Sequence, residues 1–163
     1  MPRSFQPAVE KLEERTTPVT FGYAWPDAEH LTLSFAPDGT GTVGAASSSL
    51  FQLLNSSFPS TAAWQSEILR AFQTWAVQAN INFGLVADQG LPFGTQGPPQ
   101  GDARFGDIRI GTYPLASEVI ALSLPYAPTE GTWTGDIKLN SAVAFAPGNA
   151  AAGYNLFTVL LHE

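Results

Sequence analysis

A chain of 163 residues with 44% hydrophobic and 13% charged residues has the length and composition of one globular domain, which excludes a disordered protein. The net charge of −7 argues against a nucleic-acid partner, because seven lysines and arginines cannot easily supply a basic patch. The absence of cysteine excludes disulfides, thiolate zinc sites and a thiol nucleophile, and no apolar run approaches the ~20 residues of a membrane span.

The first 18 residues, MPRSFQPAVEKLEERTTP, carry the densest charge of the chain and contain no apolar segment of an ordinary signal peptide. We therefore expect a charged, disordered leader over residues 1–18 and one domain over residues 19–163. The segment LEERTTP resembles a leader found at the start of large exported proteins in some bacteria. This resemblance implies a protein that is secreted or displayed at the cell surface.

The first half of the domain is predicted to contain two strands and two helices. Residues 19–23 (VTFGY) and 31–35 (LTLSF) alternate with a period of two, which is typical of strands. A short apolar cluster within residues 47–57 predicts one small helix. The clearest helix spans residues 60–80, because its large apolar residues recur at helical spacing and form one core-facing stripe. The residues of this stripe are Trp64, Ile68, Phe72, Trp75 and Ala79.

The second half is predicted to be richer in strands. Residues 81–85 alternate as a strand, and residues 88–106 form a long surface loop of Gly, Pro and Gln without periodicity. Further strands are expected within residues 107–111, 119–124 and 135–140, before a terminal helix. This order of elements predicts an α/β fold in layers, with a twisted mixed β-sheet and a long packing helix.

The chain ends with NLFTVLLHE, in which a histidine and a glutamate follow an apolar helix. In an H-E-x-x-H helix, two histidines four residues apart bind one Zn²⁺ and the carboxylate between them reaches the zinc-bound water. His162 and Glu163 supply the first two residues of such a motif. The preceding residues are apolar almost all round the helix, which predicts burial, and a buried histidine and carboxylate need partners such as a metal.

The segment YNLFTVLLHE resembles the start of the active-site helix of metzincin zinc peptidases, in the matrixin and serralysin branches. Four other segments are similar to successive elements of the same catalytic domain. They are ILRAFQTWAVQANINF, the first long helix and the strand after it; FGDIRIG, the third strand; VIALSLPYAP, the substrate-binding edge strand; and GDIKLN, the strand before the active-site helix. The resemblance covers about residues 19–163.

This resemblance implies a zincin-like fold and the N-terminal part of a zinc endopeptidase acting on proteins or peptides. His162 would be the first ligand of the catalytic Zn²⁺, and Glu163 would be the general base. The backbone of Ala121, Leu122, Ser123 and Leu124 would bind substrate as an added antiparallel strand. The second imidazole would fall four residues after His162, outside the sequence, so we expect this chain to be inactive by itself.

Two further metal sites are considered. Many matrixins hold a structural zinc largely with histidines, but the only other histidine here is His30, so we expect no such zinc. Oxygen-bearing side chains also suggest Ca²⁺, although their spacing fits no EF-hand loop, and the alternative is that they form turns with the local backbone. These residues are Asp102, Asp107, Asp136 and Asn140.

A second hypothesis for the whole chain is a non-catalytic, β-rich, secreted surface or binding module. In that case the tryptophans, phenylalanines and Gly/Pro loops would supply a ligand-binding face. The continuation of the coding sequence separates the two hypotheses, because only the peptidase requires H-E-x-x-H-x-x-G-x-x-H from His162 onward.

Overall fold

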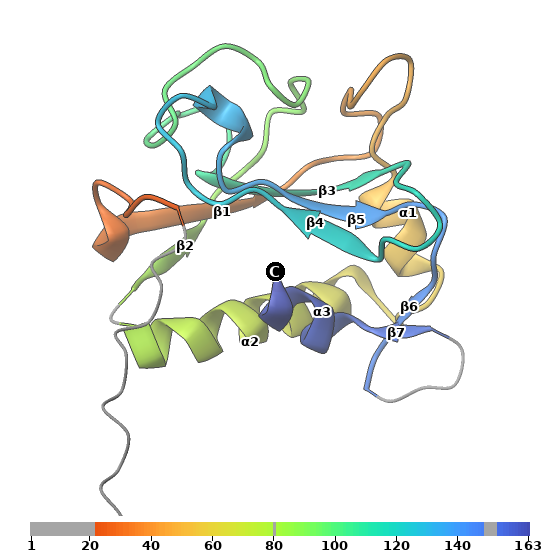
Figure 1. Cartoon of the computed structure of the whole chain (residues 1–163). Helices are drawn as coiled ribbons and strands as arrows, with labels where there is room; N and C mark the ends of the chain where they lie inside the picture. The colour runs from red at the N-terminus through yellow and green to blue at the C-terminus, as the bar shows by residue number, and fades with distance from the viewer. Residues whose placement is uncertain (1–21, 80, 149–152) are drawn as a thin grey trace, which may run out of the picture.

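The computed structural model describes residues 22–79, 81–148 and 153–163, and Figure 1 shows a sheet with helices on one side and long loops on the other. The five strands of this sheet lie in the order β2-β1-β3-β5-β4. All neighbouring pairs are parallel except β4 with β5, which is antiparallel. The fold is therefore mixed α/β, and the predicted mixed sheet with a long packing helix is confirmed.

From residue 31 onward the elements follow the predicted segments with small differences in bounds. The sheet strands are β1 (Leu31–Phe35), β2 (Phe83–Leu85), β3 (Ile108–Tyr113), β4 (Ala121–Ser123) and β5 (Ile137–Asn140). The helices are α1 (Leu50–Asn55), α2 (Thr61–Ala79) and α3 (Leu156–His162), with short 3-10 turns η1 (Ala28–His30) and η2 (Gly131–Trp133). A small parallel pair, β6 (Phe145–Ala146) and β7 (Tyr154–Asn155), leads into α3.

The main core lies between the sheet and the helices. Alternate residues of the strands point to this side, including Leu33, Ile110 and Leu139, which are fully buried. From α2 they meet Trp64, whose ring packs edge-on against Phe35 at a centroid distance of 5.2 Å. The indole N–H of Trp64 donates to Asn55 of α1, which ties the two helices together.

The position of Trp75 corrects the prediction for α2. Trp64 and Phe72 are buried as expected, but Trp75 is 50% exposed. The helix is longer than the core beneath it, so its stripe runs past the buried region toward the end of α3. The spacing of the apolar residues correctly identified the face of α2 that turns toward the core. It could not show how far along the helix the core extends.

The other side of the sheet is buried too, and it is polar. The 88–106 loop covers it; this segment is a surface loop without helix or strand, as its composition predicted, and its buried rings Phe93 and Phe105 pack toward the sheet. Ser34 of β1 donates to Asp88, and Thr32 donates to Asp107. Arg109 of β3 forms a bidentate ion pair with Asp88 in which both side chains are 1% exposed.

Two expectations concern residues near the start of the chain. The predicted leader, residues 1–18, lies outside the described residues. Of the predicted strand at 19–23, only Gly22 and Tyr23 are described, and neither is in a strand. None of the helices within the described residues is long and apolar enough to cross a membrane.

Candidate active site

The helix that ends at His162 is fixed at both ends by side-chain hydrogen bonds. Asn155 caps its start, with its side-chain oxygen accepting a 3.0 Å bond from the backbone N–H of Thr158. At its end, the indole N–H of Trp75 donates to the carbonyl of Leu161 at 3.1 Å. The half-exposed Trp75 therefore positions the last turn of α3, which is a role that periodicity alone did not reveal.

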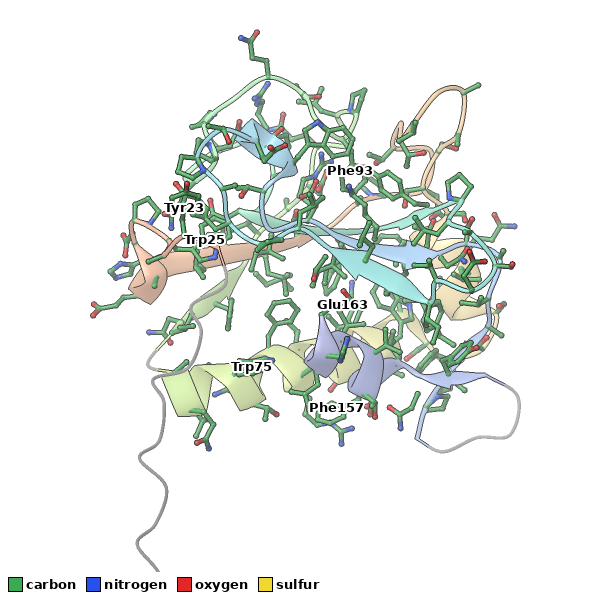
Figure 2. The ribbon with its side chains drawn as sticks, viewed as in Figure 1. Tyr23, Trp25, Trp75, Phe93, Phe157 and Glu163 are labelled. Carbon is green, nitrogen blue, oxygen red and sulfur yellow. The ribbon has the colours of Figure 1, made fainter. Side chains whose placement is uncertain are left out.

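The packing of α3 is one-sided. Leu156 and Leu160 are buried in the main core, and the Arg70 guanidinium of α2 lies 4.2 Å from the ring centre of Phe157. His162, in contrast, is exposed, and Glu163 is only partly covered. The expectation of a buried histidine was wrong, because Leu156 and Leu160 face the core from one side of the helix and His162, two residues after Leu160, lies on the opposite side. Figure 2 shows Glu163 at the end of α3, between the sheet and the helices.

His162 and Glu163 lie where two clefts meet. One cleft, of about 480 Å³, runs between α2 and the sheet and is lined by aromatic rings that include Trp25, Phe72 and Trp75. The other, of about 490 Å³, lies between α3 and the beginning of β4, where Ile120 forms part of its wall. A molecule lying along β4 would therefore pass the imidazole and the carboxylate.

The strand β4 occupies the position predicted for it. It is the last strand of the sheet, antiparallel to β5, with Ala121 opposite Leu139 and Ser123 opposite Ile137. The residues just before it and just after it line the same clefts as His162 and Glu163. The predicted edge position, direction and place beside the terminal helix are confirmed.

The hydrogen bonds of this strand divide the four predicted backbone positions into two kinds. The Ile120 carbonyl accepts from Asn140, and Leu124 both donates to Asp136 and accepts from Gly135. Alternation along an antiparallel strand then turns Leu122 toward β5 and turns the N–H and C=O groups of Ala121 and Ser123 outward. An added strand would pair with Ala121 and Ser123, and the exposed side chain of Leu122 would lie beside it.

The proposed calcium ligands are largely occupied by the protein itself. Asp102 binds Arg104, which lowers the pKa of this carboxyl, and Asp107 accepts hydrogen bonds from Thr32 and from the backbone of Gly101. The Asn140 side chain bonds three backbone groups between residues 116 and 142. For these three residues the contacts agree with the alternative of local structural bonding, whereas the buried side chain of Asp136 makes no hydrogen bond to the described residues. His30 pairs with Asp27 at the surface.

Metal-binding geometry is incomplete in the part of the chain that the structure describes. Within residues 22–79, 81–148 and 153–163, no three His, Cys, Asp or Glu side chains gather closely enough to hold a metal ion. His162 is the imidazole at the cleft, and Glu163 is the carboxylate beside it. This pair supplies an imidazole and a carboxylate, which is at most two zinc ligands, where a catalytic zinc needs three.

One group of charged residues was not identified from the sequence. Arg109, Asp136 and Lys138 lie on the loop side of β3 and β5 with at most 8% exposure. Burial raises the pKa of Asp136 to about 8, against the opposing effect of the positive charges of Arg109 and Lys138. The available signal was the alternation of charged and apolar residues in DIRIG and GDIKLN, which places the charges on one face of the sheet.

Comparison with known proteins adds no relative, since no model of a protein family matches the sequence and no curated protein matches it either.

Proposed function

We propose that this chain forms the N-terminal part of a zinc-dependent endopeptidase domain. One observation carries the proposal: the antiparallel edge strand β4 and the His162–Glu163 pair at the end of α3 line the same clefts. An edge strand binds extended peptides of many sequences through main-chain hydrogen bonds. An imidazole and a carboxylate beside that strand are the side chains that metal-assisted hydrolysis of a peptide bond requires.

In this proposal each part of the site has its own role. A substrate peptide pairs with the outward backbone groups of Ala121 and Ser123, which holds its scissile bond along the cleft. His162 would hold zinc through its exposed imidazole, and a bound zinc ion would lower the pKa of a water molecule and polarise the substrate carbonyl. Glu163 accepts the proton of the attacking water and returns it to the leaving amine. Trp75 positions the last turn of α3 that carries both residues.

The proposal is tested by metal analysis of two lengths of chain. A catalytic zinc needs three protein ligands, so the 163-residue chain should lose zinc on dialysis and leave casein intact. A chain extended through the third histidine of H-E-x-x-H-x-x-G-x-x-H should retain about one zinc per chain and cleave casein. A coding sequence that continues without this motif would instead support the non-catalytic binding module.

Within the extended chain, two substitutions separate the roles of the pair. His162→Ala should lose both zinc and proteolysis, because it removes a ligand. Glu163→Ala should retain zinc and lose most turnover, because it removes only the base. Loss of zinc in the Glu163→Ala protein would mean that Glu163 is a ligand and that the base lies elsewhere.

A further inference from the structure

The loop side of the sheet contains a buried carboxyl that has no hydrogen-bond partner. Asp136, just before β5, is 0% exposed, and neither of its side-chain oxygens is hydrogen-bonded to any residue that the structure describes. A buried carboxylate without partners is costly, whereas the neutral acid avoids most of that cost. The position of Asp136 therefore favours a bound proton.

The charged groups around Asp136 do not neutralise it. Arg109, on the neighbouring strand, is bound to Asp88 and enclosed by the rings of Phe93 and Phe105, 4.4 and 4.2 Å from its central carbon. Lys138 lies over the ring of Trp133, 4.5 Å from the ring centre. Neither cation forms an ion pair with Asp136, and the positive charges of both, together with the backbone of Arg109, lower the pKa of this carboxyl less than burial raises it.

Tyr113 is the remaining titratable group of this cluster. Its hydroxyl is buried and, among the described residues, has no hydrogen-bond partner, while Lys138 lies 5.1 Å from its ring centre. Burial raises the pKa of Tyr113, with a further rise from the charge of Asp136, so it stays neutral throughout the physiological range. Burial also lowers the pKa of Lys138, against the opposing charge of Asp136. Asp136 is consequently the acid of this cluster whose charge can change near neutral pH.

The cover over this cluster is made of loops. We use "loop layer" for residues 88–106 and 125–134, which lie above the sheet in Figure 1. The loop layer encloses the cluster with aromatic rings. Phe93, labelled in Figure 2, fills the space above Gly111, where an added Cβ atom would lie 2.6 Å from the ring. Hydrogen bonds such as that from Thr132 to the carbonyl of Thr95 join the two loops. Irregular segments of this kind open locally more readily than a helix core.

We propose that the loop layer is a proton-dependent lid, closed over β3 and β5 while the Asp136 carboxyl is protonated and opening to admit water as it ionises. The opening also reaches the edge strand, because the backbone of Leu124 is bonded to Gly135 and Asp136. The lid is independent of zinc chemistry and exists in the chain as it stands.

Hydrogen exchange of the 163-residue chain between pH 5 and pH 7 tests the proposal, with labelling times scaled for the intrinsic rate. Opening exposes Asp136 to water, where its pKa is that of a free carboxyl, so opening releases a proton between pH 5 and pH 7. The equilibrium constant for opening therefore rises about tenfold per pH unit. Protection of the loop-layer amides should fall about a hundredfold over this interval. At each pH these amides should exchange faster than those of α2, which carries the main core.

Two variants make the test specific. Asp136→Asn, which is neutral at every pH, should make loop-layer protection independent of pH. Asp102→Asn, in the same loop layer, removes a carboxyl that already titrates below this interval and should keep the hundredfold change. Should Asp136→Asn fail to fold, the carboxyl ¹³C resonance of Asp136 in the unaltered protein should still show the protonated form at pH 6. The proposal would be overturned if protection in the unaltered protein did not depend on pH, or if Asp136→Asn kept the same pH dependence. It would also be overturned if the loop-layer amides exchanged no faster than those of α2, or if Asp136 were ionised at pH 6.

Discussion

At the scale of single residues, the two tryptophans of α2 differ in what they stabilise. Trp64 is 0% exposed, packs against Phe35 and Phe51, and donates to Asn55. Trp75 is 50% exposed and donates to the end of α3. The same apolar stripe thus contributes core energy at one end and positions the candidate site at the other.

Trp64→Ala is expected to lower the free energy of unfolding by ~3–5 kcal/mol, because it removes buried area and leaves a cavity. Trp75→Ala removes a ring that is half in water and should cost no more than about half as much. Urea unfolding of the two variants measures both values. Equal losses would contradict the assignment of Trp64, and not Trp75, to the core.

The burial of Asp136 also predicts a pH dependence of global stability. Its pKa is about 8 in the folded chain and near 3.8 when exposed, so folding binds a proton between these values. The stability that the Asp136 carboxyl contributes is therefore fully present below pH 4 and falls by about 1.4 kcal/mol per unit as pH rises toward 8. Urea unfolding from pH 5 to 8 should show this slope in the difference between the unaltered chain and Asp136→Asn. No difference in slope would mean that Asp136 is solvated in the folded state.

At the scale of elements, the edge strand β4 separates two sets of backbone groups. One set pairs with β5 and stabilises the sheet, and the other, from Ala121 and Ser123, faces the cleft. Proline removes a single N–H donor and is tolerated on edge strands where that donor faces solvent. It therefore distinguishes the two sets one residue at a time.

Ser123→Pro should leave the urea midpoint almost unchanged and raise the KM of the extended enzyme for peptides, because it removes an outward donor. Leu122→Pro is the matched control, since it removes a donor that faces β5 and should lower the midpoint clearly. A Ser123→Pro enzyme with an unaltered KM would exclude this strand as the substrate-binding edge.

Much of the element plan was predictable, because periodicity reports which face of a segment is apolar. The strands β1, β3 and β5 and the helix α2 followed from that signal alone. The loop layer did not, because Asp88 meets Arg109 across 21 residues and no local pattern predicts such a pair. The candidate pair His162–Glu163 came from sequence, whereas its exposure and its support by Trp75 depend on where the core ends.

At the scale of the whole molecule, the sheet separates two buried layers with different chemistry. The helix side is apolar and ends in the clefts where His162, Glu163 and the edge strand meet. The loop side is polar and contains Asp136 and its neighbours. The proposed peptide hydrolysis belongs to the first layer and the proposed proton-dependent lid to the second, and the backbone of Leu124 is bonded to Gly135 and Asp136 between them.

We propose Glu163 as the general base of a zinc peptidase, and turnover of the extended chain carrying Glu163→Ala tests this role most directly. With zinc content equal in the two proteins, the account predicts that kcat for peptide cleavage falls by about 10²–10⁴-fold, the usual contribution of a positioned acid–base group. An unchanged kcat would contradict the claim, because the proton of the attacking water would then be removed by another group.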